Sequence, residues 1–449
     1  MSVSFDLARP GKRVPGDFLG LSFEAASLAQ VARYGERGNL VALLRSLGPG
    51  VLRFGGVTSD TQVAWTDAHT PLPAWASQGL DEHQLDELRV LAARSGWRVL
   101  LTIGLAHFQP RAAAREAAAA KRALGAWLAG IELGNEPDTY ARHGFRTQPW
   151  TFAHYEAQVS AYRRAIDAVA PGLALVGPDA SGSLVFENWA RDATARYRPS
   201  MLTGHHYPLG CHNIPAPTIT RLLSPKIRRA EETSLHRYLR AAHRAHLPFR
   251  LDEANTVSCG GQAGISDRFA SALWAIDYIA HTMTAGAAGI NLQANPSKCT
   301  GYTPLCATST RALADGALTP HPEWYALLMA RLLLGSRPVR ATVSTTTPAD
   351  VDALAFLAPD GVLRVLAVDD EPPGARHVKL RLRLPRRYRR TGTLALSAPS
   401  PSAASGVHLD GETNGQRRAR AAAKLPADSE STTSVDLAPS TATMVAVTP

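Results

Sequence analysis

Two acidic residues end apolar, strand-like segments and are the first candidates for chemistry in this sequence. Glu136 lies in IELGNEPDTY, residues 131–140, between an asparagine and a proline, and Glu253 lies in FRLDEANT, residues 249–256. A carboxyl group can donate a proton when it is protonated and can attack an electrophile when it is ionised. Two carboxyl groups that meet in one site can therefore act on the same bond, one as acid and one as nucleophile.

The segments that must position these residues form a regular alternation of strands and helices. Strand-like apolar runs are expected at residues 18–24, 51–56, 98–105, 130–137, 174–181, 201–208, 249–255 and 286–295. Helical stretches are expected after them at residues 39–48, 81–96, 108–128, 150–172, 183–193, 236–246, 266–283 and 321–335. Short apolar strands that are each followed by a helix predict an α/β fold of the (β/α)8 type, the TIM barrel.

In such a barrel the active site lies at the carboxyl ends of the strands. Glu136 ends the fourth expected strand and Glu253 the seventh, and we expect them to face each other across the barrel mouth. Asp252 adjoins Glu253, but side chains alternate along a strand, so only Glu253 is expected to point into the mouth. Two facing carboxyl groups suit glycoside hydrolysis, and a separation of about 5–5.5 Å indicates retention through a covalent intermediate.

After residue 336 the alternation of apolar strands and helical stretches ends, and the sequence pattern becomes that of successive strands. Alternating segments such as HVKLRLRLP and TGTLALS, with a turn signal at Pro359-Asp360-Gly361, predict a C-terminal antiparallel β-sandwich. The opening segment VSFDL could add an edge strand to this sandwich, because chain termini often meet. The polar, basic segment 411–431 is expected to be an exposed loop. The expected parts are an N-terminal strand region at 1–15, a catalytic barrel at 16–336 and the β-sandwich at 337–449.

The charge balance favours anionic partners. The formal net charge is +10 and the sequence pI is about 9.7, although an arginine-rich solvated surface would give the same balance. No stripe of basic and aromatic residues indicates a nucleic-acid surface. No window of the sequence approaches the ~20 apolar residues that span a bilayer. The oligomeric state has no signal in the sequence.

The four cysteines give information about the cellular compartment in which the protein works. Cys211, Cys259, Cys299 and Cys306 lie in expected loops and allow three pairings. One or two disulfides in loops indicate a secreted or periplasmic protein whose signal peptide is absent from this sequence. The N-terminal residues contain no apolar signal-peptide region, so a cytoplasmic location also stays open. The cysteines lack the close C-x-x-C spacing of a zinc site.

An ordered set of motifs resembles the heparanase and β-glucuronidase family of retaining glycoside hydrolases, which use two glutamates on a barrel. The matching blocks are LRFGGVTSD (52–60), IELGNEPD (131–138), HHYPL (205–209), LDEANTVSCGG (251–261), ISDRFASALWAIDY (265–278) and LTPHPEWYALLMARLLLG (318–335). They span nearly the whole expected barrel in the order that the family has.

The resemblance implies a role for each matching residue. Glu136 would be the general acid/base and Glu253 the nucleophile; Asn135 would bind the sugar's 2-hydroxyl and Tyr207 the nucleophile. The residues that would hold the terminal uronic acid or its hydroxyls are Glu24, Asp60, Gln293, Gly301 and Tyr302. In the family a backbone N–H and a tyrosine hydroxyl bind the uronate carboxylate, and neutral donors can hold an anion in this way.

The loops around the expected site depart from the family at one position. Heparanase has a tyrosine five residues after its nucleophile, and this chain has Ser258 there, followed by Cys259. Cys211 and Cys259 follow neighbouring strands, so one disulfide could join their loops. Cys299 and Cys306 could close the loop that carries Tyr302, which would pre-organise the uronate contact.

The sequence therefore predicts a retaining, heparanase-like β-glucuronidase that acts on uronic-acid-containing glycans or glycosaminoglycans without a cofactor. One alternative is a β-glycosidase for neutral sugars, such as a xylosidase, with the same two glutamates. An alternative of another class is a non-catalytic glycan-binding barrel. His205 and His206 could suggest a metal, but no third ligand lies at suitable spacing, and no metal site is predicted.

Overall fold

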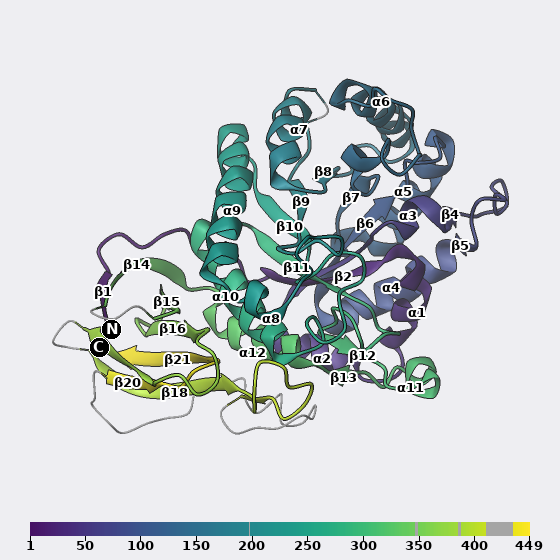
Figure 1. Ribbon diagram of the computed structural model, residues 1–449. Helices are drawn as coiled ribbons and strands as arrows, with labels where there is room; N and C mark the ends of the chain where they lie inside the picture. Colours follow the sequence, from purple (N-terminus) through teal and green to yellow (C-terminus); the bar gives the residue numbers. More distant parts are fainter. Residues whose placement is uncertain (197, 346–348, 385–387, 410–433) are drawn as a thin grey trace.

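The computed structural model describes residues 1–196, 198–345, 349–384, 388–409 and 434–449, and its larger part is a parallel barrel (Figure 1). The predicted loop at 411–431 lies outside the described residues. The barrel strands are β2 (Leu19–Glu24), β3 (Gly50–Gly55), β6 (Trp97–Ile103), β7 (Leu128–Leu133), β8 (Gly177–Ala180), β9 (Leu202–His206), β10 (Phe249–Ala254) and β11 (Gly289–Ala294). They correspond one to one to the eight expected strands.

The sheet order is β7-β6-β3-β2-β11-β10-β9-β8, and every neighbouring pair is parallel. The two ends meet at a parallel bridge between Ile131 and Leu175, where the Ile131 N–H donates to the Ala174 carbonyl at 2.9 Å. The (β/α)8 prediction is confirmed, and the carboxyl ends of all eight strands open on one face of the molecule.

Helices surround the strands in the expected positions. Those that cover the barrel are α2 (Leu40–Leu47), α4 (Glu82–Ser95), α5 (Pro110–Leu124), α6 (Phe152–Val169), α7 (Ser183–Arg196), α9 (Pro225–Ala245), α10 (Phe269–Ala285) and α12 (Pro322–Ala330). Helix α9 begins well before the expected residue 236, because Ser224 caps its first turn. The sequence did not predict this first half, because it is polar and carries little apolar periodicity. Helix α4 has a capping box between Asp81 and Gln84 and ends at Gly96 in the left-handed conformation.

Short elements fill the connections between these strands and helices. The helices among them are α1 (Leu28–Ala32), α3 (Thr58–Thr61), α8 (Ile219–Leu222) and α11 (Thr310–Asp315), with 3₁₀ turns η1 (Ala25–Ser27), η2 (Arg33–Gly35), η3 (Gly125–Trp127), η4 (Pro137–Thr139) and η5 (Arg331–Leu333). Two small ribbons pair β4 (Val63–Trp65) with β5 (Gln78–Leu80) and β12 (Leu305–Cys306) with β13 (Thr319–Pro320). No helix in the described ranges has the length and apolar character that a bilayer crossing requires.

The second sheet contains the C-terminal strands and the first strand of the chain (Figure 1). Its strands are β1 (Ser2–Asp6), β14 (Arg337–Ser344), β15 (Val351–Leu357), β16 (Leu363–Asp369), β17 (Val378–Arg383), β18 (Arg389–Ser397), β19 (His408–Leu409), β20 (Ser434–Leu437) and β21 (Thr441–Thr448). All pairs are antiparallel except β1 with β17. Strand β14 pairs with β15 through Arg337–Val339 and with β1 through Arg340–Ser344.

One apolar cluster joins both halves of this sheet. It contains Val3 from β1, Leu380 from β17, Val365 from β16 and Val447 from β21, all fully buried. Side chains from strands at opposite ends of the sheet order meet in one core, so the sheet folds over itself as a sandwich does. The domain boundaries at residues 15 and 336 stay a prediction.

Helices α10 and α12 lie between the barrel and the second sheet (Figure 1). Helix α10 contacts α12 on one side and β14, β15 and β21 on another, which explains why it is apolar nearly all round. A polar cluster lies where helices α9 and α10 contact the second sheet. Arg228 of α9 donates to Asp277 of α10 at 3.0 Å and to Asp350 at 2.8 Å, and His281 contacts Asp352 of β15 at 2.5 Å.

Candidate active site

Strand β7 delivers Glu136 through a tight turn at its carboxyl end. Gly134 has a φ of +82° and Glu136 a φ of +46°, both in the left-handed region. A Cβ on Gly134 would lie 2.5 Å from the Tyr140 hydroxyl, so no larger residue fits there. A non-glycine residue in this conformation costs roughly 1–3 kcal/mol, and such residues concentrate at functional sites. Pro137 then starts the turn η4 and fixes the backbone directly after Glu136.

Strand β10 delivers both Asp252 and Glu253 to the barrel interior. Glu253 lines the cleft and Asp252 does not, as expected, but the two side chains do not lie on opposite faces of the strand. The Glu253 carboxylate lies 2.7 Å from Arg53 and the Asp252 carboxylate 3.3 Å from the same guanidinium. The physical reason is a bulge, because the pairing of β10 with both neighbours shifts register between Leu251 and Ala254. A β-bulge breaks the strict alternation of faces and is common beside active sites.

Arg53 of strand β3 organises the floor of the site. The side chain is fully buried, and its guanidinium donates to Glu132 at 2.8 Å, Glu253 at 2.7 Å and Asp179 at 2.9 Å. It also donates to the Asn135 amide oxygen at 3.0 Å. This contact turns the Asn135 NH₂ group away from Arg53, and Asn135 lines the cleft above. The orientation suits donation to a ligand hydroxyl.

The two candidate catalytic carboxyl groups have different partners. Glu253 accepts hydrogen bonds from Arg53 at 2.7 Å and from the Tyr207 hydroxyl at 2.7 Å, so both of its oxygens are held by donors. Glu136 has one oxygen, Oε1, 2.9 Å from His205 Nδ1. One oxygen of Glu136 and one of Glu253 lie within 4.8 Å of each other. The geometry places a single reacting atom within reach of both groups.

His205 links the Glu136 carboxyl group to the buried charges below. Its Nε2 lies 2.9 Å from Asp179, and the imidazole is fully buried. Burial opposes the positive charge, but Asp179 and Glu253 outweigh burial and hold the pKa of His205 well above its usual value. A protonated His205 donates from both nitrogens, which assigns Oε1 of Glu136 as an acceptor. Oε2 is the oxygen of Glu136 that His205 does not contact.

Two further buried acids, Asp179 and Asp252, have pKa values that are shifted in opposite directions. Burial would raise the pKa of Asp179, but Arg53 and His205 lower it below its usual range. Burial, Asp179 and Glu132 raise the pKa of Asp252 well above its usual value. A protonated Asp252 lowers the number of negative charges that Arg53 and His205 must balance, which makes so dense a buried cluster possible.

A cleft of about 740 Å³ lies above these groups. Of the residues predicted for the site, those that line it are Glu24, Asn135, Glu136, Tyr207, Glu253, Gln293 and Tyr302. Gln293 is 2% exposed and its Oε1 has no hydrogen-bond partner among the described residues. Burial and the nearby Glu253 raise the pKa of Glu24, although Thr58 donates to its carboxylate at 2.7 Å. Glu24 and Gln293 are thus polar groups available to a ligand.

Asp60 is placed differently from the prediction, which assigned it to the sugar. It does not line the cleft and is 1% exposed. Its carboxylate accepts from the backbone N–H groups of Leu105 at 2.7 Å, Ala106 at 2.9 Å and Asn135 at 3.1 Å, and from the Tyr140 hydroxyl at 2.7 Å. All of its acceptor capacity is used by the protein. Asp60 therefore holds Asn135 in position, and its contact to a sugar stays a prediction.

Two loops close one side of the cleft and pack on each other through glycines. A Cβ on Gly301 would lie 2.2 Å from the Gly260 carbonyl oxygen, and a Cβ on Gly261 would lie 2.3 Å from the Tyr302 nitrogen. The Gly260 N–H donates to the Tyr302 hydroxyl at 2.9 Å. Gly301 itself lies behind the cleft lining. Disulfides pair Cys211 with Cys259 and Cys299 with Cys306, so both loops are cross-linked near Tyr302.

No family model and no curated protein matches this chain. Among solved structures it is similar to a 4-O-α-L-rhamnosyl-β-D-glucuronidase from Fusarium oxysporum, with a TM-score of 0.74, 16% identity, and 99% of this chain and 100% of the other covered. It is also similar to α-L-arabinofuranosidases from Thermotoga maritima and Bifidobacterium longum, each with a TM-score of 0.68, 14% identity and 99% of both chains covered. At these identities the similarity establishes the fold: a TIM barrel with a C-terminal β domain.

Several residues of the site are absent from the prediction. Arg53 and Asp179 form the buried network, and Arg142, His143 and Ser181 line the cleft. Arg53 had a signal in the sequence, because it interrupts the apolar run VLRFGG, and a charge inside a barrel strand needs buried partners. The loop residues Arg142 and His143 had none, since only the folded turn after Glu136 brings them to the cleft.

Replacement of Arg53 by methionine is expected to destabilise the fold by about 3–5 kcal/mol, because Glu132, Asp179 and Glu253 would stay buried without their cation. Urea unfolding followed by circular dichroism measures this change. The matched control is Arg98→Met on strand β6, whose side chain is exposed and for which we expect a change within about 0.5 kcal/mol. Equal stability of the two variants would show that Arg53 does not hold the buried acids together.

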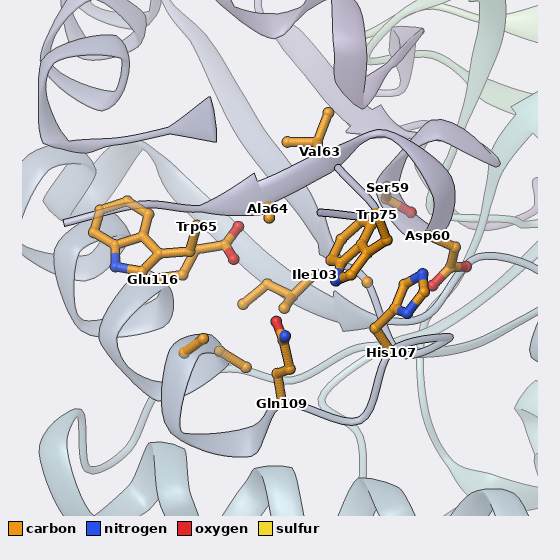
Figure 2. A pocket seen from close by; sticks show the side chains of 13 residues that line it. Ser59, Asp60, Val63, Ala64, Trp65, Trp75, Ile103, His107, Gln109 and Glu116 are labelled. Carbon is orange, nitrogen blue, oxygen red and sulfur yellow. The ribbon is translucent and has the colours of Figure 1, made fainter. Parts of the chain in front are cut away.

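A smaller cavity of about 30 Å³ lies on the other side of Asp60 (Figure 2). Trp75 stacks on His107 at a centroid distance of 3.9 Å beside Asp60, and Glu116 of α5 faces the cavity from the opposite side. Glu116 is 8% exposed, and burial raises its pKa to about 8. Glu116 therefore holds a proton in the folded state that the unfolded chain releases above its ordinary pKa of 4.5.

Replacement of Glu116 by glutamine is expected to stabilise the protein at neutral pH. Because the folded pKa is raised, the wild-type protein loses stability as the pH rises from 4.5 to about 8, and glutamine has no proton to lose. We expect a gain of about 3 kcal/mol at pH 7 and none at pH 4. Thermal unfolding of both proteins at the two pH values measures the difference, and a pH-independent difference would contradict it.

Proposed function

We propose that this protein is a retaining glycoside hydrolase that cleaves β-linked glucuronic acid from glycans. The observation that carries the proposal is the approach of Glu136 and Glu253, whose oxygens lie within 4.8 Å at the floor of an open cleft. Retaining enzymes hold their two carboxyl groups about 5–5.5 Å apart, whereas inverting enzymes leave about 6.5–9.5 Å for a water molecule. A closest approach of Glu136 and Glu253 below the separation of inverting enzymes supports the retaining mechanism.

The partners of each carboxyl group suit the proposed steps. Arg53 and Tyr207 donate to Glu253, which stabilises its negative charge and aims it at the anomeric carbon. Glu136 donates its Oε2 proton to the leaving oxygen as Glu253 forms a bond to the anomeric carbon. Glu136 then takes a proton from water as the water displaces Glu253 and restores the starting configuration. The Asn135 amide donates to the sugar's 2-hydroxyl in both steps.

Two observations support glucuronic acid as the sugar. Tyr302 lines the cleft, and its hydroxyl, held by the Gly260 N–H at 2.9 Å, is a donor of the type that the heparanase family uses for the uronate. The solved structure from Fusarium oxysporum that shares this fold is named as a β-D-glucuronidase and holds a rhamnose–glucuronate ligand. The two disulfides support a secreted or periplasmic location.

A β-glycosidase for neutral sugars is the second candidate, and one feature of the cleft favours it. Glu24 lines the floor beside Glu253, and an ionised Glu24 would repel a bound uronate. A neutral sugar would instead donate a hydrogen bond from one of its hydroxyls to the same carboxylate. Its raised pKa reduces this repulsion, which is why we place the glucuronidase first.

Hydrolysis of a panel of 4-nitrophenyl glycosides separates these candidates. We expect the β-glucuronide to be cleaved with a kcat/KM at least about 10-fold above those of the β-xyloside, the β-glucoside and the α-L-arabinofuranoside. Preference for a neutral glycoside would replace the first candidate by the second. Absence of turnover on all four, with binding retained, would identify a non-catalytic glycan-binding barrel. The Glu253→Gln variant serves as the inactive control.

A further inference from the structure

A second hollow of about 260 Å³ adjoins the cleft. The two share Ser181 and Tyr207 as lining residues, so they form one continuous depression at the carboxyl ends of the barrel strands. The walls of the second hollow come from the start of helix α7 and from helix α9, which pack against each other (Figure 1). The depression is therefore longer than a single sugar binding site.

The hollow lies on the leaving-group side of the proposed reaction. Ser181 is attached to the turn that carries Glu136, because its N–H and its hydroxyl donate to Asp138 at 2.9 Å and 2.6 Å. The acid Glu136 must face the leaving oxygen, so the space beyond Glu136 receives the leaving group. Glu24, Gln293 and Tyr302, which would hold the cleaved sugar, come from other strands and loops of the barrel.

The side chains of the hollow suit a substituted sugar ring. Leu184 is 68% exposed and Val185 is 36% exposed, and together they give an apolar surface beside the depression. Ser234 and Arg237 face the hollow from helix α9. Within the described part of the chain, Arg237 has no ion-pair partner. A guanidinium free of carboxylates is suited to binding a carboxylate or a sulfate with two hydrogen bonds.

We propose that this hollow is a binding subsite for the outer part of the leaving-group glycan, with Arg237 binding a carboxylate or sulfate on that sugar. The inference rests on the proposed glycosidase function and gives its substrate class. The substrate is a chain with at least two sugar units after the scissile bond, and cleavage takes place within a chain or at the end of a long one. A simple aryl glycoside fills the cleft alone.

Kinetics with substrates of increasing length test the subsite. The substrates are 4-nitrophenyl β-glucuronide, a β-glucuronide of a disaccharide with a sulfated outer sugar, the same compound with a carboxylate in place of the sulfate, and a neutral version. For Arg237→Ala we expect the ratio of kcat/KM on an anionic compound to that on the aryl glucuronide to fall about tenfold, mainly through KM. The arm with the larger loss identifies the anion.

The control is Arg229→Ala, which removes an exposed arginine from the same helix outside the hollow. We expect this ratio to match that of the wild-type protein. An Arg237→Ala ratio equal to that of Arg229→Ala would overturn the subsite, and so would equal wild-type kcat/KM values for the anionic and neutral compounds. Failure of the proposed function is a separate result, because it would appear as the absence of turnover on the aryl glucuronide.

Discussion

The Glu253→Gln variant is expected to lose at least about 10⁴-fold in kcat/KM on every β-glucuronide. Glutamine keeps the size of the side chain and its contact to the Tyr207 hydroxyl, but it cannot form the bond to the anomeric carbon. Initial rates on 4-nitrophenyl β-glucuronide measure the loss. Because Glu253 also contributes to the ion cluster at Arg53, circular dichroism must first show that the variant is folded.

Chemical rescue separates loss of the nucleophile from general damage. In a Glu253→Gly variant, azide can enter the space that the carboxylate leaves and attack the anomeric carbon once. A single displacement inverts the configuration, so the expected product is the α-glucuronosyl azide. Formation of the β-azide by this variant would assign the nucleophile to another residue.

The Glu136→Ala variant has the second largest expected effect, and its size depends on the leaving group. General acid catalysis contributes roughly 10²–10⁴-fold, so we expect a loss in this range on a natural disaccharide. A 2,4-dinitrophenyl leaving group departs without a proton, so its release should be much less affected. Rates on the two substrates, compared with the wild-type ratio, measure the difference.

Azide also distinguishes Glu136 from Glu253. When the acid/base is absent, azide attacks the covalent intermediate on the face that water uses, and the second displacement gives the β-glucuronosyl azide. An equal loss on both leaving groups, without azide rescue, would contradict the acid/base role. It would instead point to a role of Glu136 in folding, which its strained backbone conformation makes a specific alternative.

The barrel could be predicted because its signals are local. Eight apolar runs with helices between them leave few alternatives to a closed parallel sheet, and each run formed a strand. Helix α10, apolar nearly all round, is buried on both sides. The first half of α9 escaped prediction because polar residues such as Arg228 and Glu231 contact neighbouring elements there without an apolar periodicity, and its beginning depends on the cap at Ser224.

The candidate site could be predicted only in part. Residue types at strand ends identified Glu136 and Glu253, since a barrel brings all strand ends to one face. The inward turn of Asp252 could not be predicted, because a bulge depends on the register with both neighbouring strands. The surroundings of Asp60 in the short helix α3 could not be predicted either. Its position matched a family motif, but the fold uses its carboxylate to hold Asn135 and neighbouring backbone.

The buried network also escaped prediction, because it depends on contacts among strands that are distant in the sequence. Arg53 on β3 meets Glu132 on β7, Asp179 on β8 and Glu253 on β10. Arg53 and Glu253 each have a signal in the sequence, but nothing in the sequence shows that they meet. Only the closed barrel shows that a single guanidinium holds the proposed nucleophile and the asparagine beside the proposed acid.

The anomeric configuration of the first product tests the central claim most directly. Proton NMR of 4-nitrophenyl β-glucuronide hydrolysis, recorded before mutarotation, resolves the H1 signals of α- and β-glucuronic acid. Two displacements at one carbon, by Glu253 and then by water, predict that the β-anomer appears first and the α-anomer only later. Initial release of the α-anomer would show a single displacement and would contradict the proposed roles of Glu136 and Glu253.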